Sequence, residues 1–128
     1  MPSSASIRGL RRIMNELRAI EPDFPASYAA VLLFIAYHVE TQGEEPNVAD
    51  IANNTGIHSP SVSRILLTLS DRRLGRTSLG EKRPAGSRKA LGLVSRTPDP
   101  VDLRMIRLSL TEKGKGLIAR MTENLENT

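Results

Sequence analysis

Residues 48–71 constrain the fold more than any other part of this chain. Ala52 suits a position where two helices approach closely, and Gly56, four residues later, can adopt the positive φ of a tight turn between helices. Val62 follows six residues after that glycine, on the inward side of a second apolar-periodic run. The other inward positions are Ile51, Ile57 and Ile65. This spacing predicts a helix-turn-helix, and the alternative is two ordinary core helices joined by a glycine.

The second helix of this pair has its own start signals and a polar outward side. Ser59, or His58 before it, can serve as N-cap, and Pro60 suits the first turn, where its missing N–H costs nothing. Val62, Ile65 and Leu69 face inward, which leaves hydroxyls and one guanidinium outside. These candidate DNA-binding residues are Ser59, Ser61, Ser63, Arg64 and Thr68. Arg64 can bond a guanine through two hydrogen bonds or bond a phosphate, and the residues leave that choice open.

Charge is distributed unevenly along this chain of net charge +4. Up to Ser63 there are 4 basic and 7 acidic residues, and from Arg64 onward there are 14 basic and 7 acidic. The two parts therefore carry −3 and +7. A basic half that begins on the second helix of the pair favours a polyanionic partner, whereas the alternative is a set of solvated loops.

A basic stretch at residues 72–90 follows the predicted helix-turn-helix. It holds seven basic side chains, three glycines and a proline without apolar periodicity, so we expect a loop. Its basic residues are Arg72, Arg73, Arg76, Lys82, Arg83, Arg88 and Lys89. Such a loop can lie along DNA phosphates, where each neutralised charge releases counterions, or it can be a solvated insertion.

The apolar pattern changes to period two within residues 91–111. Residues 93–97 and 104–110 are predicted strands around a turn-rich connector that contains Pro98 and Pro100. They predict a β-hairpin. A helix-turn-helix followed by a hairpin is a winged helix, whose second helix enters the major groove while the hairpin tip reaches the backbone or an adjacent minor groove.

Helices are predicted on both sides of this unit. Residues 6–20 repeat apolar side chains at three- and four-residue steps, and residues 26–41, with Pro25 in the first turn, are apolar on most sides and predict a central core helix. Thr111 can cap a last helix over 112–125. The helix at 6–20 has to pack on something, and a partner subunit and its own domain are equally compatible with its pattern. We therefore expect one domain over residues 1–128, of the α+β class: mainly α with a small β-hairpin.

Several classes of function are disfavoured. The chain has no cysteine, which excludes disulfides and zinc fingers, and its 3% aromatic content argues against a stacking platform for single strands. Its longest apolar run, residues 29–36, is too short for a membrane span, so we expect a cytoplasmic protein. His38 and His58 lie on different elements without a nucleophile motif, and we expect neither catalysis nor a cofactor or metal. Tyr28, Tyr37 and His38 can line a ligand pocket, although core packing is the commoner role of such side chains.

An ordered set of residues follows the helix-turn-helix: Gly92-Leu93-Val94-Ser95-Arg96, Asp99-Pro100, Asp102-Leu103-Arg104 and Leu108-Ser109-Leu110-Thr111-Glu112-Lys113-Gly114. In these residues the chain resembles the MarR family of winged-helix transcription regulators. The resemblance covers residues 24–121 and implies a homodimer on a pseudo-palindromic operator. It also implies that Arg104 is the DNA-binding arginine of the wing and Asp102 the carboxylate that orients it. An arginine on a hairpin tip is suited to the negative potential of a narrow minor groove, and the alternative is a surface ion pair.

The chain departs from that family pattern in its wing and in the stretch before the wing. The middle residue of the wing triplet, often basic in the family, is Leu103, and the basic stretch from Arg73 to about Leu91 is inserted before the first wing strand. We expect a sequence-specific transcription regulator that binds double-stranded DNA and can respond to a small-molecule effector. The alternative is a winged-helix module that binds protein or structured RNA through its basic face.

Overall fold

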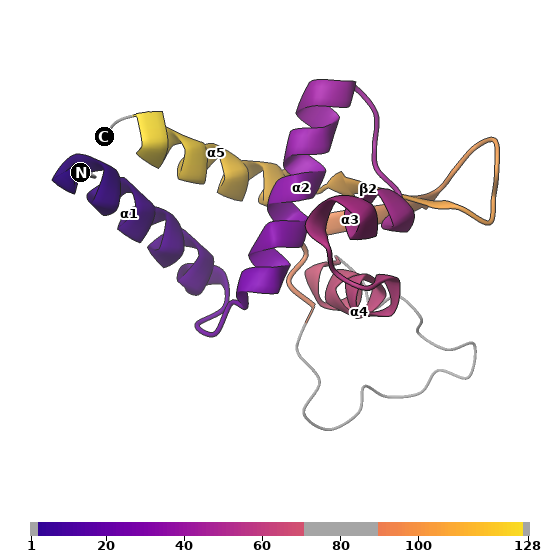
Figure 1. Cartoon of the computed structure of the whole chain (residues 1–128), viewed down its shortest axis with the longest axis horizontal. Coiled ribbons are helices and arrows are strands. Elements are labelled where there is room, and N and C mark those ends of the chain that lie inside the picture. The colour runs from indigo at the N-terminus through magenta and orange to yellow at the C-terminus, as the bar shows by residue number, and fades with distance from the viewer. Residues whose placement is uncertain (1–2, 71–89, 127–128) are drawn as a thin grey trace.

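The computed structural model describes residues 3–70 and 90–126 of the chain. Within them the helices and strands follow one another as α1 (Ser4–Ile20), α2 (Ala26–Gln42), α3 (Val48–Thr55), α4 (Ser59–Leu69), β1 (Val94–Pro98), β2 (Ile106–Leu110) and α5 (Glu112–Glu126). The predicted winged helix-turn-helix with flanking terminal helices is therefore confirmed. In Figure 1, α1 and α5 lie side by side at one end, α2 crosses the middle, and α3, α4 and the hairpin form the other end.

The helix-turn-helix forms for local reasons that the sequence carries. Asn47 and Asp50 make a reciprocal capping box at the start of α3, with N–H to side-chain oxygen distances of 3.0 and 2.8 Å. Gly56 ends α3 at φ 77°, and its N–H donates to the carbonyl of Ala52 at 3.0 Å. His58 occupies the N-cap position of α4, with Pro60 in the first turn. The sharp turn between the helices therefore depends on a residue that tolerates positive φ.

The hairpin is antiparallel, and its register pairs Val94 with Leu110 and Pro98 with Ile106. The other edge of β2 is also satisfied, because the Leu108 N–H donates to the carbonyl of Pro46 at 2.9 Å. An isolated antiparallel bridge between Asn47 and Arg107 continues this contact. The segment leading into α3 thus lies against β2 and ties the wing to the helix-turn-helix.

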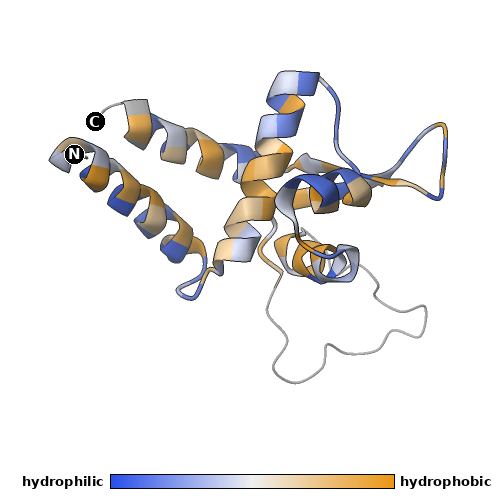
Figure 2. Cartoon of the chain, viewed as in Figure 1, coloured by the Kyte–Doolittle hydropathy of each residue, from blue (hydrophilic) through white to orange (hydrophobic). Residues whose placement is uncertain are grey.

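One apolar core joins all the elements. Its buried side chains include Leu17 of α1, Leu32 of α2, Leu66 of α4, Leu93 before β1 and Leu117 of α5. Figure 2 colours much of α2 and α4 as hydrophobic and the segment between α2 and α3 as hydrophilic. The core thereby holds α4 by one side only and leaves its other side to solvent.

Some boundaries differ from those expected from the sequence. Ser3 accepts a hydrogen bond from the Ser6 N–H at 3.0 Å, so α1 begins at Ser4 rather than at residue 6. The second strand begins at Ile106 rather than at residue 104, because the Met105 N–H donates to the carbonyl of Asp102 at 2.9 Å and closes a turn there. Pro25 is the cap residue of α2 and not part of its first turn.

The interpretation of α2 as apolar core on most sides is only partly right. Val31, Leu32 and Ile35 are buried, whereas Leu33, Tyr37 and Val39 are exposed. His38 packs against Phe34 at 5.4 Å between ring centroids, and Tyr28 packs edge-on against Phe24. Tyr28 and His38 therefore pack within the fold, with Nε2 of His38 buried without a hydrogen-bond partner among the described residues, while Tyr37 faces solvent.

Candidate nucleic-acid interface

The outward side of α4 is the first part of the candidate interface. Val62, Ile65 and Leu69 are buried as predicted, and Leu66, which the sequence pattern did not single out, is buried with them. Ser59, Ser63 and Arg64 are exposed, and Ser61 and Thr68 are partly exposed. The exposed surface of α4 thus consists mainly of hydroxyl groups around a single guanidinium. Leu67 and Pro60 add apolar surface there.

Arg64 is the one cation that α4 presents. Its Nη2 donates to the Ser61 hydroxyl at 3.2 Å, one helical turn back along α4. A bond this long on an exposed surface is exchanged easily for a bond to a stronger acceptor, such as a phosphate oxygen or a guanine. This hydrogen bond holds the guanidinium along the helix and leaves its other N–H groups able to donate to a partner.

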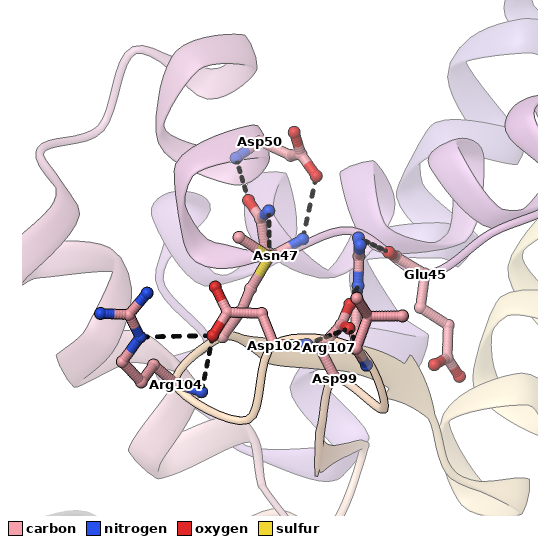
Figure 3. A network of polar contacts seen from close by, with 9 residues as sticks. Glu45, Asn47, Asp50, Asp99, Asp102, Arg104 and Arg107 are labelled. Carbon is pink, nitrogen blue, oxygen red and sulfur yellow. Dashed lines mark hydrogen bonds and ion pairs between the residues drawn. The ribbon is translucent and has the colours of Figure 1, made fainter.

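The wing tip, defined here as residues 99–105, is the second part of the candidate interface. The Arg104 side chain is 93% exposed, and its Nε lies 3.4 Å from Oδ1 of Asp102. The same oxygen accepts the Arg104 backbone N–H at 3.1 Å (Figure 3). The carboxylate thus fixes the start of the arginine side chain, and the terminal guanidinium nitrogens extend into solvent. Such an exposed ion pair adds little stability, so it orients the arginine rather than holding the fold.

A buried ion pair holds the base of the wing. Nε of Arg107 lies 2.6 Å from Oδ2 of Asp99, whose residue is only 6% exposed. Oδ1 of Asp99 accepts the N–H groups of Val101 at 2.7 Å and Asp102 at 3.0 Å. Hydrogen bonds from the Asp102 amide, the Arg107 guanidinium and the Val101 amide lower the pKa of Asp99 to about 2. The hydrogen bond to Asp99 also raises the pKa of Arg107.

The same arginine joins the wing to the segment before α3. Nη1 of Arg107 donates to the carbonyl of Glu45 at 2.9 Å, and nearby the Asn47 amide lies 3.2 Å from the sulfur of Met105 (Figure 3). A groove of about 460 Å³ runs between the start of α3 and the wing tip, with Asn47, Ala49 and Arg104 among its lining residues. The wing arginine and the helix-turn-helix therefore border one shared surface.

The sequence-derived site residues fall into three groups. The five on α4 share its outward side, and Asp102 and Arg104 lie together on the wing tip. The rest lie outside the described residues: Arg72, Arg73, Arg76, Lys82, Arg83, Arg88 and Lys89. The sequence reasoning missed the anchor formed by Asp99 and Arg107. Its only signal was an acid in the predicted hairpin connector and a base in the predicted strand that follows it.

Comparisons with known proteins agree on the fold. The family model of the IclR helix-turn-helix domain matches residues 38–75, which include the end of α2, all of α3 and all of α4. A comparison with curated protein sequences finds no significant match. Among solved structures, a mutant of S. aureus MepR bound to an oligodeoxyribonucleotide superposes with a TM-score of 0.62 at 20% identity, covering 95% of this chain and 71% of that one.

Two further structures extend this result. The transcriptional repressor CouR, bound to a 23-mer DNA duplex, gives a TM-score of 0.54 at 25% identity over 94% of this chain and 69% of its own. MarR itself gives 0.57 at 18% identity over 97% of this chain and 72% of its own. The chain is thus a winged-helix protein. More narrowly, it has the fold of the MarR-type transcription regulators, and the resemblance noted in the sequence is confirmed at that level.

Proposed function

We propose that this protein is a sequence-specific regulator of transcription that binds double-stranded DNA as a homodimer on a pseudo-palindromic operator. One observation carries the proposal. Two exposed guanidinium groups, Arg64 on α4 and Arg104 on the wing tip, lie at the two places where a winged helix meets a duplex. The structural neighbours MepR and CouR, each bound to DNA, support it. Binding rather than catalysis, and a cytoplasmic location, belong to the same proposal.

The two contacts have different tasks in this proposal. Arg64 and the hydroxyls of Ser59, Ser61, Ser63 and Thr68 contact the major groove, where base edges are distinguishable. Arg104, oriented by Asp102, enters the adjacent minor groove, whose negative potential attracts a guanidinium. The basic residues between 72 and 89 neutralise phosphates and add affinity that does not depend on sequence.

Exposed apolar side chains on α1 support the homodimer. Ile7, Leu10 and Met14 are exposed at three- and four-residue steps along this helix, and Leu125 of α5 is exposed as well. The two helices pack on each other, and Nε of Arg120 lies 3.1 Å from Oε2 of Glu16. In Figure 1, α1 and most of α5 lie at the end of the molecule opposite α4 and the wing tip, so a second copy can cover their apolar side without blocking α4. A small-molecule effector, which the resemblance permits, would act on the same dimer.

The test is a selection of duplexes from a random-sequence pool followed by affinity measurements on the enriched site. We expect an enriched palindrome, and we expect the Arg64→Ala, Arg104→Ala double variant to lose more than tenfold in affinity, since one specific arginine contributes about 1–3 kcal/mol. The matched control is Arg8→Ala with Arg12→Ala, which removes two exposed arginines from α1.

The competing function predicts a different outcome. A winged-helix module for protein or structured RNA would enrich no palindromic duplex. The double variant and its control would then bind any duplex equally, because only the total charge would matter. That pair of results would refute operator binding.

A further inference from the structure

The wing tip carries two apolar side chains that the fold does not use. Val101 is 94% exposed and Leu103 is 74% exposed, and neither belongs to the core cluster nor packs against it. Both lie in the seven-residue connection between β1 and β2, next to Arg104. A polar residue at either position would keep the hydrogen bonds of the tip, because position 101 contributes only its backbone N–H, to Asp99, and the other bonds come from residues 99, 102, 104 and 105. Folding therefore gives no reason for apolar side chains there.

The tip is nevertheless held in one conformation. The Asp99 N–H donates to the Met105 carbonyl at 2.8 Å and closes the connection across its base. Inside it, the Asp99 carboxylate accepts two backbone N–H groups, and the Asp102 carboxylate accepts the N–H of Arg104. Because these bonds order the backbone beforehand, a partner that buries the tip does not bear that entropy cost on binding.

The chemistry of the tip fits one surface of DNA. The walls of the minor groove are sugar rings, its floor presents hydrogen-bond acceptors, and its potential is strongly negative where it is narrow. Proteins that bend DNA from this side combine arginines with a leucine or similar wedge that partly unstacks one base step. Arg104 and Leu103 are adjacent, exposed and held on the same ordered turn.

We propose that Leu103 is a minor-groove wedge, which opens one base step in each half-site and bends the duplex while Arg104 lies in the groove beside it. Val101 packs against a sugar ring next to the opened step. This inference rests on the proposed function and adds to it a mode of recognition, because the cost of opening a step depends on its sequence. Flexible pyrimidine–purine steps are therefore preferred under the wing.

The experiment uses the full chain and the selected operator, with 2-aminopurine in place of single adenines along the site and dyes at the two ends. For the parent protein we expect a several-fold rise in 2-aminopurine fluorescence at one step in each half-site, together with a shorter distance between the dyes. Leu103→Ala is expected to remove both signals and to weaken binding about tenfold. Leu103→Lys, which adds a charge, is expected to keep affinity and still lose both signals.

Tyr37→Ala is the matched control, since it removes an exposed large side chain on α2 and should leave both signals intact. Equal thermal unfolding midpoints of parent and Leu103 variants would establish that the fold is unchanged. Two outcomes with a parent that binds its operator selectively would refute the wedge and leave the proposed function standing. In one, the Leu103 variants give the same fluorescence rise and dye distance as the parent. In the other, the parent itself gives neither signal. If Leu103→Ala instead changes the molar mass of the free protein, the tip contacts a second copy and the wedge is also wrong. If the parent enriches no duplex, both proposals fail.

Discussion

At the scale of single residues, Asp99 is a buried carboxylate with three hydrogen-bond donors around it. Its carboxylate receives two backbone N–H groups and the guanidinium of Arg107, and the residue is almost fully buried. Its ionised form is stabilised in the fold and loses these partners on unfolding. The stability of the wing base is thus linked to proton binding by Asp99.

The first prediction concerns the pH dependence of stability. The pKa of Asp99 is lowered from 3.8 to about 2 in the folded state, so between these values the unfolded state binds more protons. Its contribution is therefore complete above about pH 4 and is lost as the pH falls through the folded pKa. We expect the thermal midpoint of the parent to fall more steeply from pH 4 to pH 2 than that of Asp99→Asn. Parallel curves for the two proteins would show that Asp99 has no special role.

The second prediction separates the two exposed arginines. Arg64→Ala should relax sequence preference in the selected site and cost about 1–3 kcal/mol of binding free energy, because major-groove bonds to bases are specific. Arg104→Ala should instead reduce the preference for a narrow, A·T-rich groove beside the half-site. The measurement is a binding competition among single-base variants of the operator. Equal losses for every base variant in both mutants would assign both arginines to phosphates.

At the scale of elements, the start of α5 shows why a helix can require glycine. A Cβ at Gly114 would collide with the carbonyl oxygen of Leu93, just before β1, whereas a Cβ at Gly116 would meet nothing closer than the side chain of Arg120 at 3.5 Å. The Gly114 N–H donates to the Thr111 hydroxyl at 3.0 Å, and that hydroxyl donates to the Gly92 carbonyl. The helix start and the strand entrance are therefore locked together at very close range.

The third prediction follows from this contrast. Gly116→Ala should stabilise the protein by about 0.5–1 kcal/mol, because alanine is the better helix former. Gly114→Ala, with the same gain in propensity, should destabilise it by about 1–3 kcal/mol, because the backbone of residue 93 has to move. Chemical denaturation of both variants tests this. Two variants that shift the midpoint in the same direction would contradict the close approach.

The elements themselves could be predicted from the sequence to a large extent. The cap at Thr111, the turn at Gly56 and the inward series of Val62, Ile65 and Leu69 are local signals, and each appears in the structure. The pairing of Asp99 with Arg107, the need for glycine at position 114 and the exposed side of α2 depend on contacts between distant segments. Local periodicity carries no information about such contacts. The ion pair at the base of the wing could therefore not be predicted, although the position of Arg104 on the wing tip could.

At the scale of the whole molecule, the described residues contain no helix that is long and apolar enough to cross a membrane. The apolar residues that remain exposed on α1 form a strip along one side of that helix, at positions 7, 10 and 14. A strip of this kind is costly to leave in water and is typical of an interface. The proposed dimer assigns it to a second copy.

The fourth prediction tests that assignment. Leu10→Glu should lower the molar mass measured by light scattering to that of one chain and weaken operator binding, because a charge in an apolar interface is left without a partner. Asn15→Glu is the control, since it introduces the same charge at an exposed position of α1 that lies off the strip. A dimer that survives Leu10→Glu would place the interface elsewhere.

The fifth prediction concerns the basic residues between 72 and 89. The chain leaves α4 and returns to the same place, because the N–H groups of Leu91 and Leu93 donate to the carbonyls of Thr68 and Leu69 at 2.7 and 2.8 Å. A neutral Gly-Ser segment of equal length at 72–89 should therefore leave the unfolding midpoint unchanged. Binding should weaken for every duplex, and the dependence of log K on log salt should become shallower by about 0.9 for each lost phosphate contact. An unchanged salt dependence would show that these charges are only solvated.

The hydrogen bonds from Arg107 to Glu45 and from Leu108 to Pro46 have a consequence for the operator proposed above. They fix the wing to the start of the helix-turn-helix. The distance between the outward side of α4 and the wing tip therefore stays constant. A B-form duplex turns by about 34–36° for each base pair. One base pair inserted between the DNA site of α4 and that of the wing tip would rotate the second site out of reach. A base substitution leaves the rotation between the two sites unchanged. The proposed operators should therefore tolerate base substitutions far more readily than insertions or deletions.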